Sequence, residues 1–188
     1  MTVLQPSDLD RFVAAGTVSV PPEFPPKVRQ FYSPIDDVHG ALKVVIGSVQ
    51  HSLIVAMFGF DDDELAGLID VYLKNPNVFV QVSLDRSQAG GVHEKALLDK
   101  YAAEMEGNSV AVAIGTSEKS AIMHRKMVIV DGRVLVTGST NWSHSGETKQ
   151  DNELTVSFDP SMCTRARTIL DLEHQKMLKA RAKAASTQ

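Results

Sequence analysis

The sequence is poor in cysteine and in long apolar runs, and each shortage excludes a class of protein. Its single cysteine, Cys163, cannot form an intrachain disulfide, and no Cys/His spacing typical of a structural zinc site is present. No apolar stretch is long enough to span a bilayer, and the N-terminus lacks the basic start and apolar run of a secretion signal. We therefore expect a cytoplasmic protein whose stability comes from its hydrophobic core.

The bulk composition is that of an ordinary globular protein. With 188 residues, 43% of them hydrophobic and 22% charged, the chain fits one domain with a sizeable core. The net charge of -4 argues mildly against a polyanionic partner. The region from residue 161 onward is locally basic, which we interpret as a solvated helix face rather than a phosphate-binding patch.

The chain divides at a proline-rich stretch near its N-terminus. Residues 1–27 read as an extension, with a short helix over 7–15 and then "VPPEFPPK", whose prolines favour an extended linker. Residues 28–188 form the main domain. Its first half alternates helical and strand patterns, which predicts right-handed crossovers and a mixed, mostly parallel sheet with helices on both faces, an α/β fold. The predicted helices cover 33–50, 61–74 and 90–106, and the strands cover 52–60, 77–85 and 109–115.

The second half of the domain has a different pattern. Two apolar runs, 126–130 and 133–138, are joined by Asp131-Gly132, the strongest short signal for a β-hairpin. A last strand over 152–158 and a closing amphipathic helix over 160–183 follow. We expect the hairpin to add antiparallel strands to the sheet.

Four polar side chains are expected to gather at one rim of that sheet. His124 and Lys126 are two residues apart at the start of the hairpin, so both project from one face of the strand, about 6.5–7 Å apart. Ser139 and Asn141 repeat the spacing where the second strand returns. An imidazole, a cation, a hydroxyl and an amide suit an anionic tetrahedral centre. Because the set lacks a carboxylate pair, we expect neither a metal nor a cofactor.

These residues match a known pattern. The spacing resembles, without a gap, the HKD motif of the phospholipase D superfamily, and more loosely residues 28–180 resemble the small bacterial nucleases of that superfamily. The motif residues in this chain are His124, Lys126, Asp131, Gly138, Ser139 and Asn141. Asp131 falls at the hairpin turn, away from the rim, so we assign a structural role to it and to Gly138.

The resemblance implies a role for each remaining residue. His124 resembles the nucleophile that forms a phosphohistidine, or its partner acid. Lys126 and Asn141 resemble the phosphate clamp, with Ser139 hydrogen-bonding nearby. Glu153 resembles the downstream glutamate that orients the histidine.

The chain carries one copy of the motif, whereas larger members carry two. One imidazole cannot easily attack phosphorus from one side and protonate the leaving group on the other. The resemblance therefore implies a homodimer with the active site across its two-fold axis. We expect a metal-independent endonuclease acting on DNA or RNA. The alternatives are a phospholipase D-type lipid phosphodiesterase and a nucleic-acid-binding or scaffold module without turnover.

Three further residues are candidates for substrate contact. Arg86 and His93 lie in or near a glycine-rich loop beyond a strand end, where ligands approach open sheets, although an exposed loop is the simpler interpretation. Trp142 follows Asn141 and could stack on a base, although core packing is at least as plausible.

Overall fold

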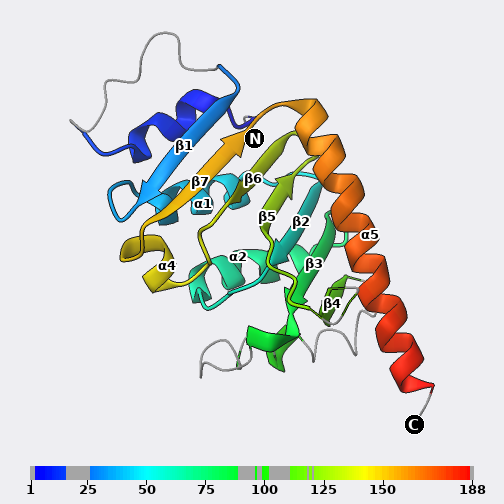
Figure 1. Cartoon of the computed structure of the whole chain (residues 1–188). Helices are drawn as coiled ribbons and strands as arrows, with labels where there is room; N and C mark the ends of the chain where they lie inside the picture. Colours follow the sequence, from blue (N-terminus) through cyan, green and yellow to red (C-terminus); the bar gives the residue numbers. More distant parts are fainter. Residues whose placement is uncertain are drawn as a thin grey trace.

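The chain folds around one seven-stranded sheet with helices on both faces (Figure 1). The computed structural model describes residues 3–15, 26–88, 96, 99–101, 111–117, 119 and 121–186. The strands are β1 (Val28–Ser33), β2 (Ser52–Met57), β3 (Phe79–Asp85), β4 (Val112–Gly115), β5 (Lys126–Val130), β6 (Val134–Gly138) and β7 (Asn152–Ser157). Their order across the sheet is β1-β7-β6-β5-β2-β3-β4. The predicted single α/β domain is confirmed.

The sheet is mixed, as predicted, but less of it is parallel than we expected. Two neighbouring pairs, β2 with β3 and β3 with β4, run parallel, whereas the other four pairs are antiparallel. The difference comes partly from β1, which the sequence did not predict. Its sequence "VRQFYS" has no continuous apolar run, and it becomes a strand by pairing along its whole length with β7.

Helices cover the two faces of the sheet. α1 (Val38–Gly47) and α2 (Asp63–Leu73) bury their apolar sides in one core, together with Val55 and Val128 of the central strands. α5 (Pro160–Ala185) runs along the other face (Figure 1) and covers a second, smaller core that contains Ile54 and Ile129. Alternate residues of β2 and β5 therefore belong to different cores, as expected for strands buried on both sides.

Aspartates cap α1, α2 and α5, and the start of α1 differs from the prediction. α1 begins at Val38 because the Asp37 side chain accepts a hydrogen bond from the Gly40 backbone N–H. The predicted start at residue 33 is wrong, since Ser33 ends β1. Asp62 caps α2 and Asp159 caps α5 in the same manner.

The predicted hairpin is confirmed. β5 and β6 pair antiparallel across a turn in which Asp131 and Gly132 both have positive φ, 51° and 64°. Glycine adopts that conformation without steric cost and aspartate tolerates it, which explains the Asp-Gly signal.

The remaining described elements are short. η1 (Pro6–Phe12) and η2 (Arg86–Gln88) are 3-10 helices, and α4 (His144–Thr148) is a single helical turn after β6. Leu9 of η1 is fully buried in the core beneath α1. The predicted helix over 90–106 lies almost entirely outside the described residues. Among the helices that the structure describes, none is long and apolar enough to cross a membrane.

Candidate active site

His124 and Lys126 meet at the end of the central strands. Lys126 is the first residue of β5 and pairs with Met57, the last residue of β2. Its Nζ lies 4.6 Å from the centre of the Phe58 ring, and the His124 ring lies edge-on to the same ring at 4.5 Å. Both side chains therefore lie against Phe58, as expected for residues two apart in an extended segment.

The two groups differ in their exposure. His124 is exposed, whereas Lys126 is only 5% exposed. Burial lowers the pKa of the Lys126 ammonium, because removal from water disfavours its charged form. Its one hydrogen bond, to the His124 carbonyl oxygen, is long at 3.4 Å, and no ion pair within the described part of the chain involves it. Because a buried charge is costly unless it is paired, a buried cation without a carboxylate partner favours the binding of an anion.

Asn141 lies beside Gly59, the residue that follows Phe58. The Trp142 N–H donates to the Gly59 carbonyl at 2.9 Å, which draws residues 141–142 against the segment after β2. A Cβ on Gly59 would lie 2.9 Å from Asn141 Cγ, so the absent side chain leaves room for the amide. Asn141 Oδ1 is buried and has no hydrogen-bond partner among the described residues. Phe58 and Gly59 thus connect the histidine and lysine to the asparagine.

Ser139 contacts Asn152 rather than the side chain of Glu153. Its hydroxyl donates to Asn152 Oδ1 at 3.0 Å and accepts from the Glu153 backbone N–H at 3.1 Å. The Glu153 side chain is exposed, and alternation along β7 places it on the face opposite Leu154, which shares a core with Val128. No hydrogen bond from the Glu153 side chain to His124 is present among the described residues, and its orienting role stays a prediction. Neighbouring residues of a strand face opposite sides of the sheet, so Asn152 and Glu153 cannot both face the Ser139 hydroxyl with their side chains.

Asp131 and Gly138 have structural contacts away from the histidine. The Asp131 carboxylate accepts hydrogen bonds from the backbone N–H groups of residues 50, 51 and 52, at 2.8–3.1 Å for the shortest contact of each. These bonds join the hairpin turn to the start of β2. A Cβ on Gly138 would lie 2.2 Å from the Glu153 carbonyl oxygen, so the close approach of β6 to β7 requires glycine there.

The structure describes two of the three further candidates for substrate contact, Arg86 and Trp142, and shows no contact between them. Trp142 is 1% exposed and packs edge-on to Phe60 at 5.3 Å, which is the core packing that was the alternative to stacking on a base. Arg86 is exposed in η2, at the same sheet edge as the end of β2. His93 lies outside the described residues.

Asp85 is a positioning residue that the sequence did not single out for this role. It ends β3, is completely buried, and accepts hydrogen bonds from the backbone N–H groups of Ser87 at 2.8 Å and Met123 at 2.5 Å. The second bond anchors the residue directly before His124. An acid at the end of an apolar strand, with a serine two residues later, was the available signal.

A cavity of about 450 Å³ opens beside His124. It lies between the segment leading into β5 and the middle of α5, and its charged lining residues are Lys119, Arg125, Glu173 and Lys176. Glu173 pairs with Arg125 at 2.7 Å. The lining therefore has more basic than acidic groups, which favours an anionic ligand.

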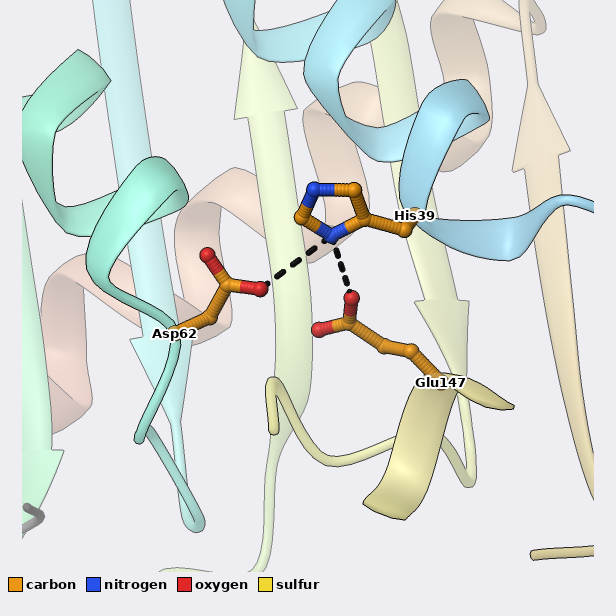
Figure 2. Close-up of side chains that lie close together, drawn as sticks. All are labelled: His39, Asp62 and Glu147. Carbon is orange, nitrogen blue, oxygen red and sulfur yellow. Dashed lines mark hydrogen bonds and ion pairs between the residues drawn. The ribbon is translucent and has the colours of Figure 1, made fainter. Parts of the chain in front are cut away.

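A second polar cluster, also missed from the sequence, joins three helices (Figure 2). His39 of α1, Asp62 before α2 and Glu147 of α4 place their polar atoms within 4.8 Å of one another. Burial raises the pKa of Glu147 to about 7, although its hydrogen bond to His39 opposes that rise. Burial lowers the pKa of His39, but hydrogen bonds to Glu64 and Glu147 outweigh it and leave the pKa raised.

Comparison with known proteins identifies the family to which this chain is similar. The family described as "Cardiolipin synthase, PLD-like domain" matches residues 42–176. The chain is 29% identical over 118 residues to the mitochondrial cardiolipin hydrolase of Chlamydomonas reinhardtii, covering 62% of this chain and 48% of that protein. Identity to the Xenopus tropicalis cardiolipin hydrolase is 30% over 122 residues, 63% of this chain and 53% of that protein. The chain thus spans about half the length of these hydrolases.

Two solved structures share the fold. Nuc from Salmonella typhimurium, a phospholipase D family member, superimposes with a TM-score of 0.64 at 22% identity, covering 78% of this chain and 92% of Nuc. NucT from Helicobacter pylori gives a TM-score of 0.63 at 22% identity, covering 81% of this chain and 96% of NucT.

Proposed function

Because the chain belongs to the phospholipase D superfamily, we propose that it is a metal-independent phosphodiesterase whose chemistry is carried by His124, Lys126 and Asn141. The observation that carries this proposal is the buried Lys126 ammonium, which lies against the same Phe58 ring as the His124 imidazole and has no described ion pair. A cation held in this way stabilises the charge that develops on the non-bridging oxygens.

The proposed reaction has two displacements at phosphorus. A ring nitrogen of His124 attacks, the N–P bond forms and the ester P–O bond breaks, while an acid on the opposite side protonates the leaving oxygen. Water then attacks the phosphohistidine, the new O–P bond forms and the N–P bond breaks, and the water proton passes to a base. Lys126 Nζ and the Asn141 amide N–H hold the non-bridging oxygens in both steps. Ser139 is proposed to keep the β6 end and Asn152 in register.

The acid on the opposite side is proposed to be His124 of a second subunit. The sequence has one His-x-Lys copy, and in-line displacement needs the nucleophile and the acid on opposite sides of phosphorus. A two-fold homodimer supplies both with one sequence. If each site needs His124 from both chains, a mixed dimer of wild-type and His124→Ala subunits has no complete site, so excess His124→Ala protein should lower the activity per wild-type chain. Activity per wild-type chain that stays constant in exchanged mixtures would exclude the shared site, and light scattering reports the subunit number.

Nucleic acid is the proposed substrate class. The motif and its surroundings resemble the small bacterial nucleases of the superfamily, and the basic lining of the cavity beside His124 suits a polyanion. The chain also covers more than nine-tenths of Nuc and of NucT, so its size matches these compact members.

A lipid phosphodiester is the second candidate substrate. The relatives that favour it are the cardiolipin hydrolases, which are 29–30% identical to this chain. Hydrolysis of plasmid DNA, RNA and cardiolipin vesicles, measured side by side, separates the two substrate classes. Salt-dependent binding of nucleic acid without cleavage of any of the three would instead support a binding module.

The experiment that tests the proposed chemistry compares three proteins in excess chelator. Wild-type protein should hydrolyse a phosphodiester at an unchanged rate, and His124→Ala should lose hydrolysis. His144→Ala is the matched control, because His144 is an exposed histidine at the start of α4 and lies outside the motif that contains His124. Loss of wild-type activity in chelator under conditions where the protein stays folded would refute the metal-independent mechanism.

A further inference from the structure

We propose that His39, Asp62 and Glu147 form a binding site for a divalent cation, with Zn²⁺ as the best-fitting ion. The site is separate from His124 and Lys126, and its role is structural. Its three side chains come from α1, from the residue before α2 and from α4. An ion bound there would join three elements that are up to 108 residues apart in the chain. The proposal does not depend on the phosphodiesterase assignment.

The atoms already converge on one point. His39 Nδ1 lies 2.6 Å from Glu147 Oε2 and 3.1 Å from Asp62 Oδ2, and Figure 2 shows both carboxylates facing this nitrogen. Ligand atoms on a tetrahedral zinc, with bonds near 2.1 Å, lie about 3.4 Å apart. Occupation therefore requires each of these two distances from His39 Nδ1 to lengthen by less than about 1 Å.

With both carboxylates ionised, the cluster has more hydrogen-bond acceptors than protons to share. Nε2 of His39 lies 2.9 Å from Glu64 Oε2, so its N–H has a partner. In that tautomer Nδ1 is a lone pair that faces two carboxylate oxygens. A second proton on the ring could satisfy one of them well. Glu147 Oε1 would still be without a donor, since it is buried and has no hydrogen-bond partner among the described residues.

Glu147 provides the observation that points to a ligand. The residue is 2% exposed, and its carboxylate faces the same His39 nitrogen as that of Asp62 (Figure 2). A buried carboxylate is costly unless it is paired, protonated or bound to a metal. With a neutral imidazole, the charges of Asp62 and Glu147 sum to the value that one divalent cation neutralises.

The surroundings of His39 resemble those of a metal ligand. A histidine that binds a metal through one nitrogen usually donates its other N–H to a carboxylate, which fixes the ring orientation. Glu64 occupies that position, and Lys43 Nζ holds Glu64 at 2.6 Å. The His39 side chain is 28% exposed, which leaves a route for an ion and for water to complete its coordination.

The imidazole decides between the candidate ions. Mg²⁺ and Ca²⁺ prefer six or more oxygen ligands, whereas one imidazole and two carboxylates suit Zn²⁺. α4 also supports the loop that carries Asn141, because a Cβ on Gly146 would lie 2.5 Å from the Asn141 carbonyl oxygen. A bound ion would therefore stabilise the fold beneath that loop, and its removal by chelator should lower thermal stability without changing the rate of the folded protein.

Calorimetric titration of chelator-stripped, full-length protein with ZnCl₂ tests the proposal. Wild type should bind one equivalent and gain thermal stability as zinc is added. Glu147→Gln should lose at least about 100-fold in affinity, and Glu64→Gln about 10-fold, as for ligands and for groups that orient them. Asp63→Asn is the matched control, because it removes one exposed acid beside Asp62 but outside the cluster, and it should bind as wild type does.

Two further measurements keep the result interpretable. Asp62→Asn removes a ligand charge but retains a residue that caps helices well, so it separates loss of binding from loss of the helix start. Visible absorption after Co²⁺ substitution reports coordination directly, and Glu147→Gln should change the bands. Absence of saturable zinc binding in wild type, or equal affinity in wild type and Glu147→Gln, would overturn the proposal. Stabilisation by acid alone, with no effect of metal, would assign the cluster to a shared proton and would also overturn it.

Discussion

Asp85→Asn should disable the site from a position outside it. One carboxylate oxygen of Asp85 accepts from the Met123 N–H at 2.5 Å, and the other accepts from the Ser87 N–H and hydroxyl at 2.8 and 2.5 Å. An amide has only one acceptor oxygen. If that oxygen stays with the two Ser87 donors, the amide NH₂ faces the Met123 N–H, and a donor meets a donor.

The expected loss of stability follows from the hydrogen bonds that Asp85→Asn removes. A hydrogen bond to a charged group contributes about 1.5–3 kcal/mol, and a buried donor left without a partner costs about 1–3 kcal/mol. Since Asp85 is completely buried, solvent screening does not reduce these values. We expect Asp85→Asn to lower the free energy of unfolding by about 2–4 kcal/mol. His124 directly follows the released residue, and a displacement near 1 Å can lower the rate about 100-fold.

Urea unfolding followed by circular dichroism measures the first effect, and hydrolysis of a chromogenic phosphodiester measures the second. Ser87→Ala is the control, because it removes the hydroxyl donor and leaves the Met123 bond intact, so activity should stay near wild type. Asp85→Asn protein with unchanged stability and unchanged kcat would refute the assigned anchoring role.

Three other predictions test separate parts of the structure. Gly59→Ala places a Cβ 2.9 Å from Asn141 Cγ and should lower kcat about 10-fold and stability by about 1–3 kcal/mol, whereas Gly67→Ala, in α2 with open space around it, should not lower either. Burial lowers the pKa of Lys126, so the ammonium is lost as pH rises through a value below 10.5; kcat/KM should fall there, and Lys126→Arg should lack this alkaline limb. The Cys163 thiol, 1% exposed and with a pKa raised to about 11 by burial and by Asp159, should react with a disulfide reagent at pH 8 only after unfolding. Equal rates for the native and unfolded protein would contradict this burial.

The elements that the sequence predicted well are those whose pattern is local. α2 and α5 have helical periodicity and aspartate caps, and the β5–β6 hairpin has its Asp-Gly turn. β1 was missed because its strand conformation depends on pairing with β7, about 120 residues further along the chain. Tertiary pairing of this kind overrides weak local propensity.

The same distinction holds for the candidate site. His124 and Lys126 could be paired from their spacing alone, and the structure places both against Phe58. The contact of Ser139 with Asn152 was not predicted, because it depends on which face of β7 meets Ser139, and a shift of one residue reverses the face. The cluster of His39, Asp62 and Glu147 carries no local signal, because only the packing of α1, α2 and α4 brings these residues together.

Detection of a covalent adduct tests the proposed mechanism most directly. Protein quenched in denaturant during turnover of a short nucleic-acid phosphodiester, digested and mapped by mass spectrometry at neutral pH, should carry the phosphoryl fragment on His124. The same fragment should be absent from His124→Ala. Hydrolysis that proceeds with no adduct and at an undiminished rate in His124→Ala, or an adduct on a different residue, would contradict the assignment of His124 as the nucleophile.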